Sequence, residues 1–166
     1  NRTLKIVIEW QRVVCVHCVM NTDNMSILGL TIDYGPYGWL EDFNPDWTPN
    51  TSESQNRRYR FGNQPDIALW NLVQLGNALY PLIGDIPAME KILEDYNTLF
   101  DQQYHQMMKN KLGLEENYDN ILHDDLQAVL KLTETDMTIF YRNLSSVLKT
   151  DFAENALEKI SNAFYK

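Results

Sequence analysis

Apolar side chains recur every three to four residues along much of the chain, which is the spacing of one helix face. The pattern begins at residues 3–16, where apolar residues cover most of the circumference, so this segment is expected to be a core helix. Helical spacing returns at Asp66 and predicts a helical bundle over 66–166. Its segments are 66–81, 87–113, 118–131, 136–148 and a last amphipathic stretch at 151–166, with Asp151 as N-cap.

A short apolar run interrupts the helical pattern between residues 25 and 33. Met25–Leu28 and Leu30–Asp33 are predicted to form two short strands that turn at Gly29. Residues 17–24 form the loop that leads into this hairpin, and residues 34–49 form an irregular loop rich in Gly, Pro and aromatic side chains. The predicted fold class is therefore mainly α with a small β-hairpin, in a single domain over 1–166.

Composition narrows the range of partners. The chain has 166 residues, a net charge of −9 and a pI of about 4.7, so nucleic acid is not expected to bind. No apolar run approaches the roughly 18 residues of a membrane span, and no membrane partner is expected. Because the chain opens with Asn1 and has no signal-peptide pattern, we expect a segment of a longer protein.

The two cysteines, Cys15 and Cys18, are spaced as C-x-x-C. A zinc site would need a second ligand pair, which does not follow at suitable spacing, whereas a redox dithiol stays open. Two small buried side chains are the favoured interpretation. His17, between them, is expected to support the loop through a hydrogen bond rather than to act as a base.

Two polar clusters flank the predicted hairpin. Asp23 and Asn24 precede it, and Asp33 ends it, followed by Tyr34 and Gly35. Phosphoryl-transfer enzymes of the kinase type use an Asp as base and an Asn and a second Asp as Mg²⁺ ligands, the latter in a D-aromatic-G motif. The sequence offers all three residues, although a kinase loop separates the base from the Asn and this chain does not. A turn that merely uses Asp and Asn remains the alternative.

At these residues the chain resembles the selenoprotein O family. The resemblance rests on residues 19–29 and 31–38, and continues through Arg58-Tyr59, Gln64-Pro65, Trp70-Asn71-Leu72, 111–114 and 140–142. It implies a protein-kinase-like fold, of which this chain is the C-terminal lobe, and transfer of AMP from ATP to Ser, Thr or Tyr hydroxyls of proteins. It also implies that Asp23 is the catalytic base, that Asn24 and Asp33 bind Mg²⁺ (or Mn²⁺), and that Asp33 contacts ATP.

Three departures from the family pattern qualify that reading. Members usually carry Gly where this chain has Val14 and Cys18, and an aromatic residue at Cys15. The family's nucleotide-binding lobe is not in this chain, so the segment alone is expected to be inactive. The cluster Arg57-Arg58-Arg60 is expected to be a solvated loop rather than a substitute phosphate site.

Two other functions stay open: a conventional phosphotransferase lobe and a non-catalytic helical interaction module. The resemblance implies a cytoplasmic location if the protein is bacterial and a mitochondrial one if it is eukaryotic.

Overall fold

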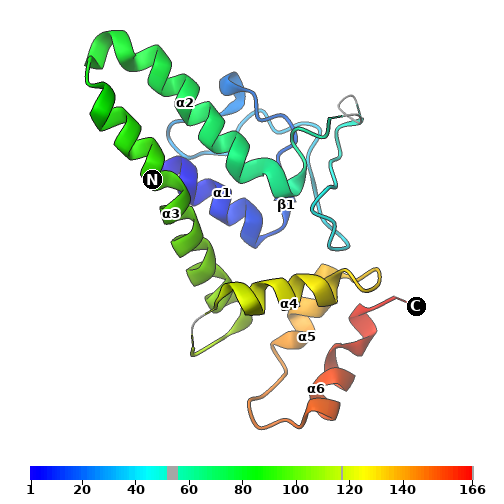
Figure 1. Cartoon of the computed structure of the whole chain (residues 1–166). Coiled ribbons are helices and arrows are strands. Elements are labelled where there is room, and N and C mark those ends of the chain that lie inside the picture. The colour runs from blue at the N-terminus through cyan, green and yellow to red at the C-terminus, as the bar shows by residue number, and fades with distance from the viewer. Residues whose placement is uncertain (52–55, 117, 166) are drawn as a thin grey trace. The chain divides into compact units, whose positions relative to one another are not determined.

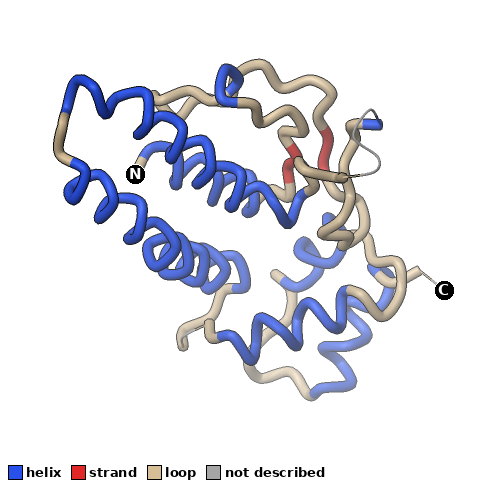
Figure 2. The backbone as a smooth tube through the Cα atoms, turned by 45° about the horizontal axis from the view of Figure 1, so that its top comes forward, coloured by secondary structure: helices blue, strands red, loops and turns tan. Residues whose placement is uncertain are grey.

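The computed structural model describes residues 1–51, 56–116 and 118–165, and they form a mainly helical protein with one small antiparallel sheet (Figures 1 and 2). The helices are α1 (Arg2–Arg12), α2 (Gln64–Ile83), α3 (Ile86–Leu112), α4 (Asn120–Leu130), α5 (Met137–Leu144) and α6 (Ala153–Ile160). The strands are β1 (Cys15–Val16) and β2 (Gly38–Trp39), and short 3₁₀ turns occur at η1 (Thr22–Asn24), η3 (Phe61–Asn63) and η4 (Ser161–Ala163). The predicted fold class, mainly α with little β, is confirmed at this level.

The chain divides into two compact units, although the sequence showed no boundary. The first comprises residues 1–39 and 45–104, and the second comprises residues 40–44 and 105–166. The long helix α3 contributes its first part to one unit and its last part to the other.

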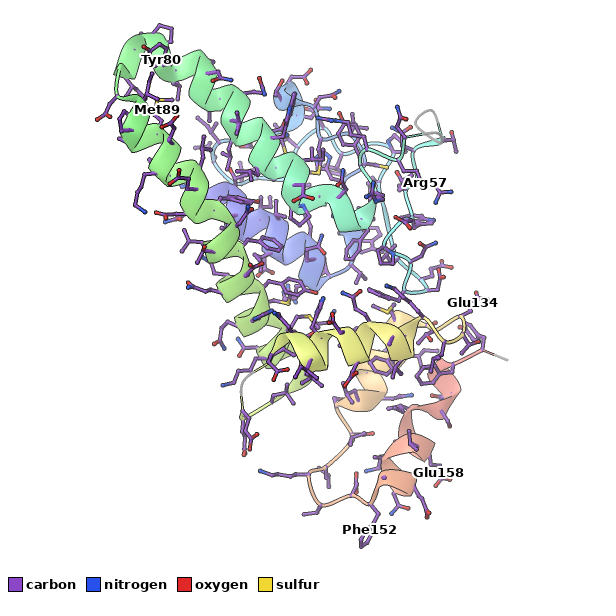
Figure 3. All side chains as sticks on the ribbon, in the orientation of Figure 1. Arg57, Tyr80, Met89, Glu134, Phe152 and Glu158 are labelled. Atoms are coloured by element: carbon purple, nitrogen blue, oxygen red, sulfur yellow. The ribbon has the colours of Figure 1, made fainter. Side chains whose placement is uncertain are left out.

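In the first unit, α1 lies beside α2, and α2 turns back into α3 (Figure 2). Helix α1 buries Leu4, Val7, Ile8 and Trp10 on one face, as expected of a core helix. Helix α2 continues through Pro81 and ends at Gly84, whose φ of +68° is a left-handed cap that glycine adopts without strain. Tyr80 and Met89 lie on the two sides of this turn (Figure 3).

The first helix is shorter than predicted. It ends at Arg12, and Cys15–Val16 pairs instead with Gly38–Trp39, with Cys15 opposite Trp39. The residues between helix and strand include Val14 at a φ of +53°, a left-handed conformation that cannot continue a right-handed helix. Apolar spacing alone assigned these residues to the helix, whereas the β-branched side chains within 13–16 are typical of the strand that forms at Cys15–Val16.

The two strands predicted at Met25–Leu28 and Leu30–Asp33 do not form. One antiparallel bridge, Met25 to Thr31, remains around a tight turn in which Gly29 N–H donates to the Ser26 carbonyl at 3.1 Å. The apolar residues of this run have no core face to cover, because Ile27 and Leu28 are 68% and 57% exposed. Gly29 itself is required: its φ is +72°, and a Cβ there would meet the Arg2 carbonyl oxygen at 3.0 Å.

The second unit is built on α4, α5 and α6. Asp119 and Asp136 cap α4 and α5 by accepting hydrogen bonds from the N–H groups of Leu122 and Ile139. Asp151 does not cap α6 as predicted: the N-cap is Phe152, and Asp151 instead accepts from the Leu148 N–H and the Lys159 ammonium. Phe152 is 80% exposed and points away from α6 (Figure 3).

Within the described part of the chain, no helix is long and apolar enough to cross a membrane. The predicted polar loop at 51–61 is described only in part, because residues 52–55 lie outside the described ranges.

Candidate active site around Asp23, Asn24 and Asp33

The turn η1 carries Asp23 and Asn24. Its geometry is fixed from within: Asn24 N–H donates to the Asn21 carbonyl at 3.0 Å, and the Asn24 side-chain Nδ2 donates to the Val19 carbonyl at 3.0 Å. The second bond orients the amide and leaves Oδ1 as the atom available to a ligand. Asp23 is exposed to solvent, whereas Asn24 is half-buried.

The Met25–Thr31 bridge brings the two polar clusters toward one another. Asp23 and Asn24 directly precede the bridged Met25, and Ile32 and Asp33 directly follow the bridged Thr31, so the two polar clusters flank the same bridge. Trp10 Nε1 donates to Thr31 Oγ1 at 3.0 Å and holds the returning arm against α1. Asp33 has a φ of +48°, a left-handed conformation that Asp tolerates better than most residues and that is found at functional sites.

His17 lies behind this turn and is 1% exposed. Its Nε2 lies 2.7 Å from the Ile32 carbonyl oxygen, which can only accept, so Nε2 carries the proton. Burial lowers the pKa of His17, while the hydrogen bond to Ile32 and the nearby Asp33 carboxylate act in the opposite direction. The predicted structural role, support of the loop by a hydrogen bond, agrees with this geometry.

Helix α2 and the loop before it supply further anchors to the segment that leads to Asp23. Gln64 accepts from the His17 backbone N–H at 2.8 Å and donates to the Cys15 carbonyl at 3.0 Å. Asn71 Nδ2 donates to the Met20 carbonyl at 3.0 Å, and the Tyr59 hydroxyl donates to Asn21 Oδ1. A pocket of about 270 Å³ lies beside these contacts, lined in part by Thr22, Ser26 and Asn71.

The donor atoms suit a hard divalent cation. Among the described residues, no three His, Cys, Asp or Glu side chains gather as a metal site, so an all-acidic or thiolate site is not what this region offers. One amide oxygen with one or two carboxylates, on an exposed turn, is instead the sparse set that Mg²⁺ uses when phosphate oxygens and water complete its shell. The residues present therefore fit Mg²⁺ together with a nucleotide.

Comparison with known proteins identifies the family of this chain. The family model described as Protein adenylyltransferase SelO matches residues 1–165. The chain belongs to the SelO family. Relatives named Protein nucleotidyltransferase YdiU include those of Flavobacterium johnsoniae, at 63% identity over 100% of this chain, and Rhodopirellula baltica, at 56% over 87%. The chain covers 32% and 27% of these two relatives, so it spans about a third of their length.

Membership of the SelO family gives meaning to the departures in this chain. Val14 and Cys18, where the resemblance pointed to glycine, have φ values of +53° and +71°. Both positions thus adopt the backbone conformation that glycine tolerates best, and the β-branched Val14 is the more strained of the two.

The predicted burial of the two cysteines is confirmed for Cys18, whereas Cys15 is only half-buried. Neither forms a disulfide; Cys18 is fully buried, and its Sγ lies 2.8 Å from Thr48 Oγ1 and accepts from the Asn50 N–H at 3.1 Å. Burial raises the pKa of the Cys15 thiol, which disfavours the thiolate that a redox pair needs.

The arginine cluster is engaged within the protein. Arg60 forms an ion pair with Asp46 at 3.0 Å, and Arg57 donates to the Asp46 carbonyl at 3.4 Å. The Arg58 guanidinium stacks on Trp70 at 4.7 Å from the ring centroid. These contacts give each arginine a structural role and do not support a substitute phosphate site.

Sequence reasoning missed the anchors Gln64, Asn71 and Tyr59. The resemblance included them as motif residues but gave them no role. The available signal was two amides seven residues apart in an apolar helical segment, a spacing that places both on one face.

Proposed function

We propose that this chain is the catalytic-loop portion of a protein adenylyltransferase with a protein-kinase-like fold, of which it forms the C-terminal lobe. The full-length protein transfers AMP from ATP to Ser, Thr or Tyr hydroxyls of proteins. The observation that supports the proposal is the antiparallel Met25–Thr31 bridge, which Asp23 and Asn24 precede and Asp33 follows, in a chain of the SelO family.

The residues have separate tasks in this proposal. Asp23, exposed on η1, accepts the proton of the attacking hydroxyl as its oxygen bonds to the α-phosphorus and pyrophosphate leaves. Asn24 Oδ1 and the Asp33 carboxylate would hold Mg²⁺ (or Mn²⁺), and Asp33 would also contact ATP. The cation, when bound, neutralises charge that develops on the phosphate oxygens.

Three expectations follow for the protein as a whole. The 166-residue chain alone is inactive, because residues that orient ATP belong to the rest of the family's length. Protein substrates and ATP are its partners. The named relatives are bacterial, which favours the cytoplasmic alternative over the mitochondrial one.

The test uses a chimaera in which this chain replaces the matching segment of the Flavobacterium johnsoniae relative. The chimaera is incubated with acceptor protein, Mg²⁺ and ATP labelled on either the α- or the γ-phosphate. AMP transfer incorporates the α-label only, whereas a conventional phosphotransferase incorporates the γ-label only. If the parent relative incorporates the α-label and the folded chimaera incorporates neither, the chain is an interaction module and the proposal is wrong.

A further inference from the structure

One face of α2 carries two buried amides in otherwise apolar surroundings. Gln64 is fully buried and Asn71 is 6% exposed; Ile67 and Ala68, on the same face, are also buried. Seven residues are about two helical turns, so the two amides lie one above the other along the helix. Both face the backbone of residues 15–20, which leads from β1 to η1.

Gln64 acts as a side-chain substitute for a neighbouring strand. Its Oε1 accepts from the His17 N–H and its Nε2 donates to the Cys15 carbonyl, so one amide satisfies both polar groups of a buried backbone segment. These two hydrogen bonds fix the start of the segment against the first turn of α2.

Asn71 fixes the other end. Its Nδ2 donates to the carbonyl of Met20, which is fully buried and lies three residues before Asp23. Asn71 Oδ1, by contrast, has no hydrogen-bond partner although it is buried. The contribution of Asn71 therefore comes from its Nδ2 donor, without which the buried Met20 carbonyl would also lack a partner.

We propose that Asn71, together with Gln64, is a positioning residue for the Asp23–Asn24 turn. The two amides bond the backbone of residues 15–20 to the rigid helix α2. The turn η1 therefore presents Asp23 and Asn24 in one orientation. This inference rests on the proposed function, because the value of that orientation lies in the transfer reaction.

The first experiment compares Asn71→Asp and Asn71→Leu with Asn77→Leu in the chimaera. Asn71→Asp keeps the size of the side chain but loses the Nδ2 donor, and Asn77 is an exposed asparagine of the same helix. Displacement of a catalytic group by about 1 Å can cost about a hundredfold in rate. We expect kcat to fall at least about tenfold in both Asn71 variants, with KM for ATP unchanged, and no change in Asn77→Leu.

The second experiment measures hydrogen exchange of the Asn24 backbone amide, which bonds to Asn21 inside η1. In Asn71→Asp we expect about tenfold faster exchange there, with no change at the Ile139 amide that Asp136 caps. Unchanged exchange at Asn24, or a loss of activity that appears only in KM, would overturn the proposal. If the unmodified chimaera transfers no AMP, the proposed function fails, while the exchange measurement still decides whether Asn71 positions the turn.

Discussion

His17 donates a hydrogen bond of 2.7 Å to the carbonyl oxygen of Ile32, the residue before Asp33. A single buried side chain therefore connects the segment that leads to Asp23 with the arm that carries Asp33. The imidazole also packs on Trp10, with ring centroids 5.0 Å apart. Since Trp10 of α1 donates to Thr31 and His17 donates to Ile32, the arm is held at two neighbouring residues.

Replacing His17 by Phe should destabilise the protein, because the aromatic packing is kept but the donor to Ile32 is lost. A carbonyl left without its partner costs about 1–3 kcal/mol when it is fully buried. The Ile32 carbonyl is only partly buried, so we expect the free energy of unfolding, measured by urea denaturation, to fall by about 1 kcal/mol. His105→Phe, in the second unit, serves as a control for the loss of an imidazole as such. An unchanged urea midpoint in His17→Phe would show that the Ile32 bond contributes nothing.

The lowered pKa of His17 predicts a pH dependence of stability. In the unfolded chain the imidazole titrates near its usual value of 6.5, whereas burial keeps it neutral to lower pH in the folded protein. Below about pH 6.5 the unfolded state thus binds more protons at His17, and stability declines as the pH falls toward the lowered pKa of the folded protein. Above about pH 6.5 His17 is neutral in both states and does not change the stability. Burial also lowers the pKa of His123, with the same sign.

The contribution of His17 can be isolated by measuring unfolding between about pH 5.5 and about pH 7.5 in wild type and His17→Phe. The variant should lose less stability on acidification than the wild type, with the His123 contribution common to both. Parallel pH curves for the two proteins would contradict the assignment.

Much of the fold was readable from the sequence, and the misses have physical causes. Helix α3 is long and periodic, and both its start near Pro87 and its end at Gly113 agree with prediction. The strand pairing of Cys15 with Trp39 was missed because it joins segments separated by a long loop and spans only two residues per strand. Periodicity reports local repetition and contains no information on such pairings.

The candidate site shows the same division. Asp23, Asn24 and Asp33 were chosen by residue type and spacing, and the Met25–Thr31 bridge joins the two segments that carry them. Their supports, Gln64 and Asn71, are amides of helix α2 that lie 47 and 51 residues along the chain from their partners His17 and Met20. The seven-residue spacing of the two amides places them on one helix face, but it does not say that this face packs against the backbone of residues 15–20.

Replacing Val14 by Gly should stabilise the protein. Val14 has a φ of +53°, where a β-branched residue is strained by roughly 1–2 kcal/mol. Glycine relieves that strain but has more conformational freedom to lose on folding, so we expect a net gain of about 1 kcal/mol in the free energy of unfolding. The matched control is Val13→Gly, because Val13 has a φ of −96° and no strain to relieve, and this change should destabilise. Equal effects at the two positions would argue against strain at Val14.

Substitutions of Asp33 should separate activity from stability. Its φ of +48° is a conformation that Asn shares with Asp but that costs Ala about 1 kcal/mol. Asp33→Asn should therefore unfold at the wild-type urea concentration, whereas Asp33→Ala should lose about 1 kcal/mol. Both remove the charged ligand, so both should reduce AMP transfer by the chimaera by about a hundredfold or more. Asp42→Asn, a change of the same charge away from the turn, should retain transfer.

Because the two Asp33 variants are expected to differ in stability but not in activity, an equal loss of transfer in both assigns the effect to the missing carboxylate. Transfer that followed stability instead, with Asp33→Asn fully active, would remove Asp33 from the proposed metal and nucleotide site.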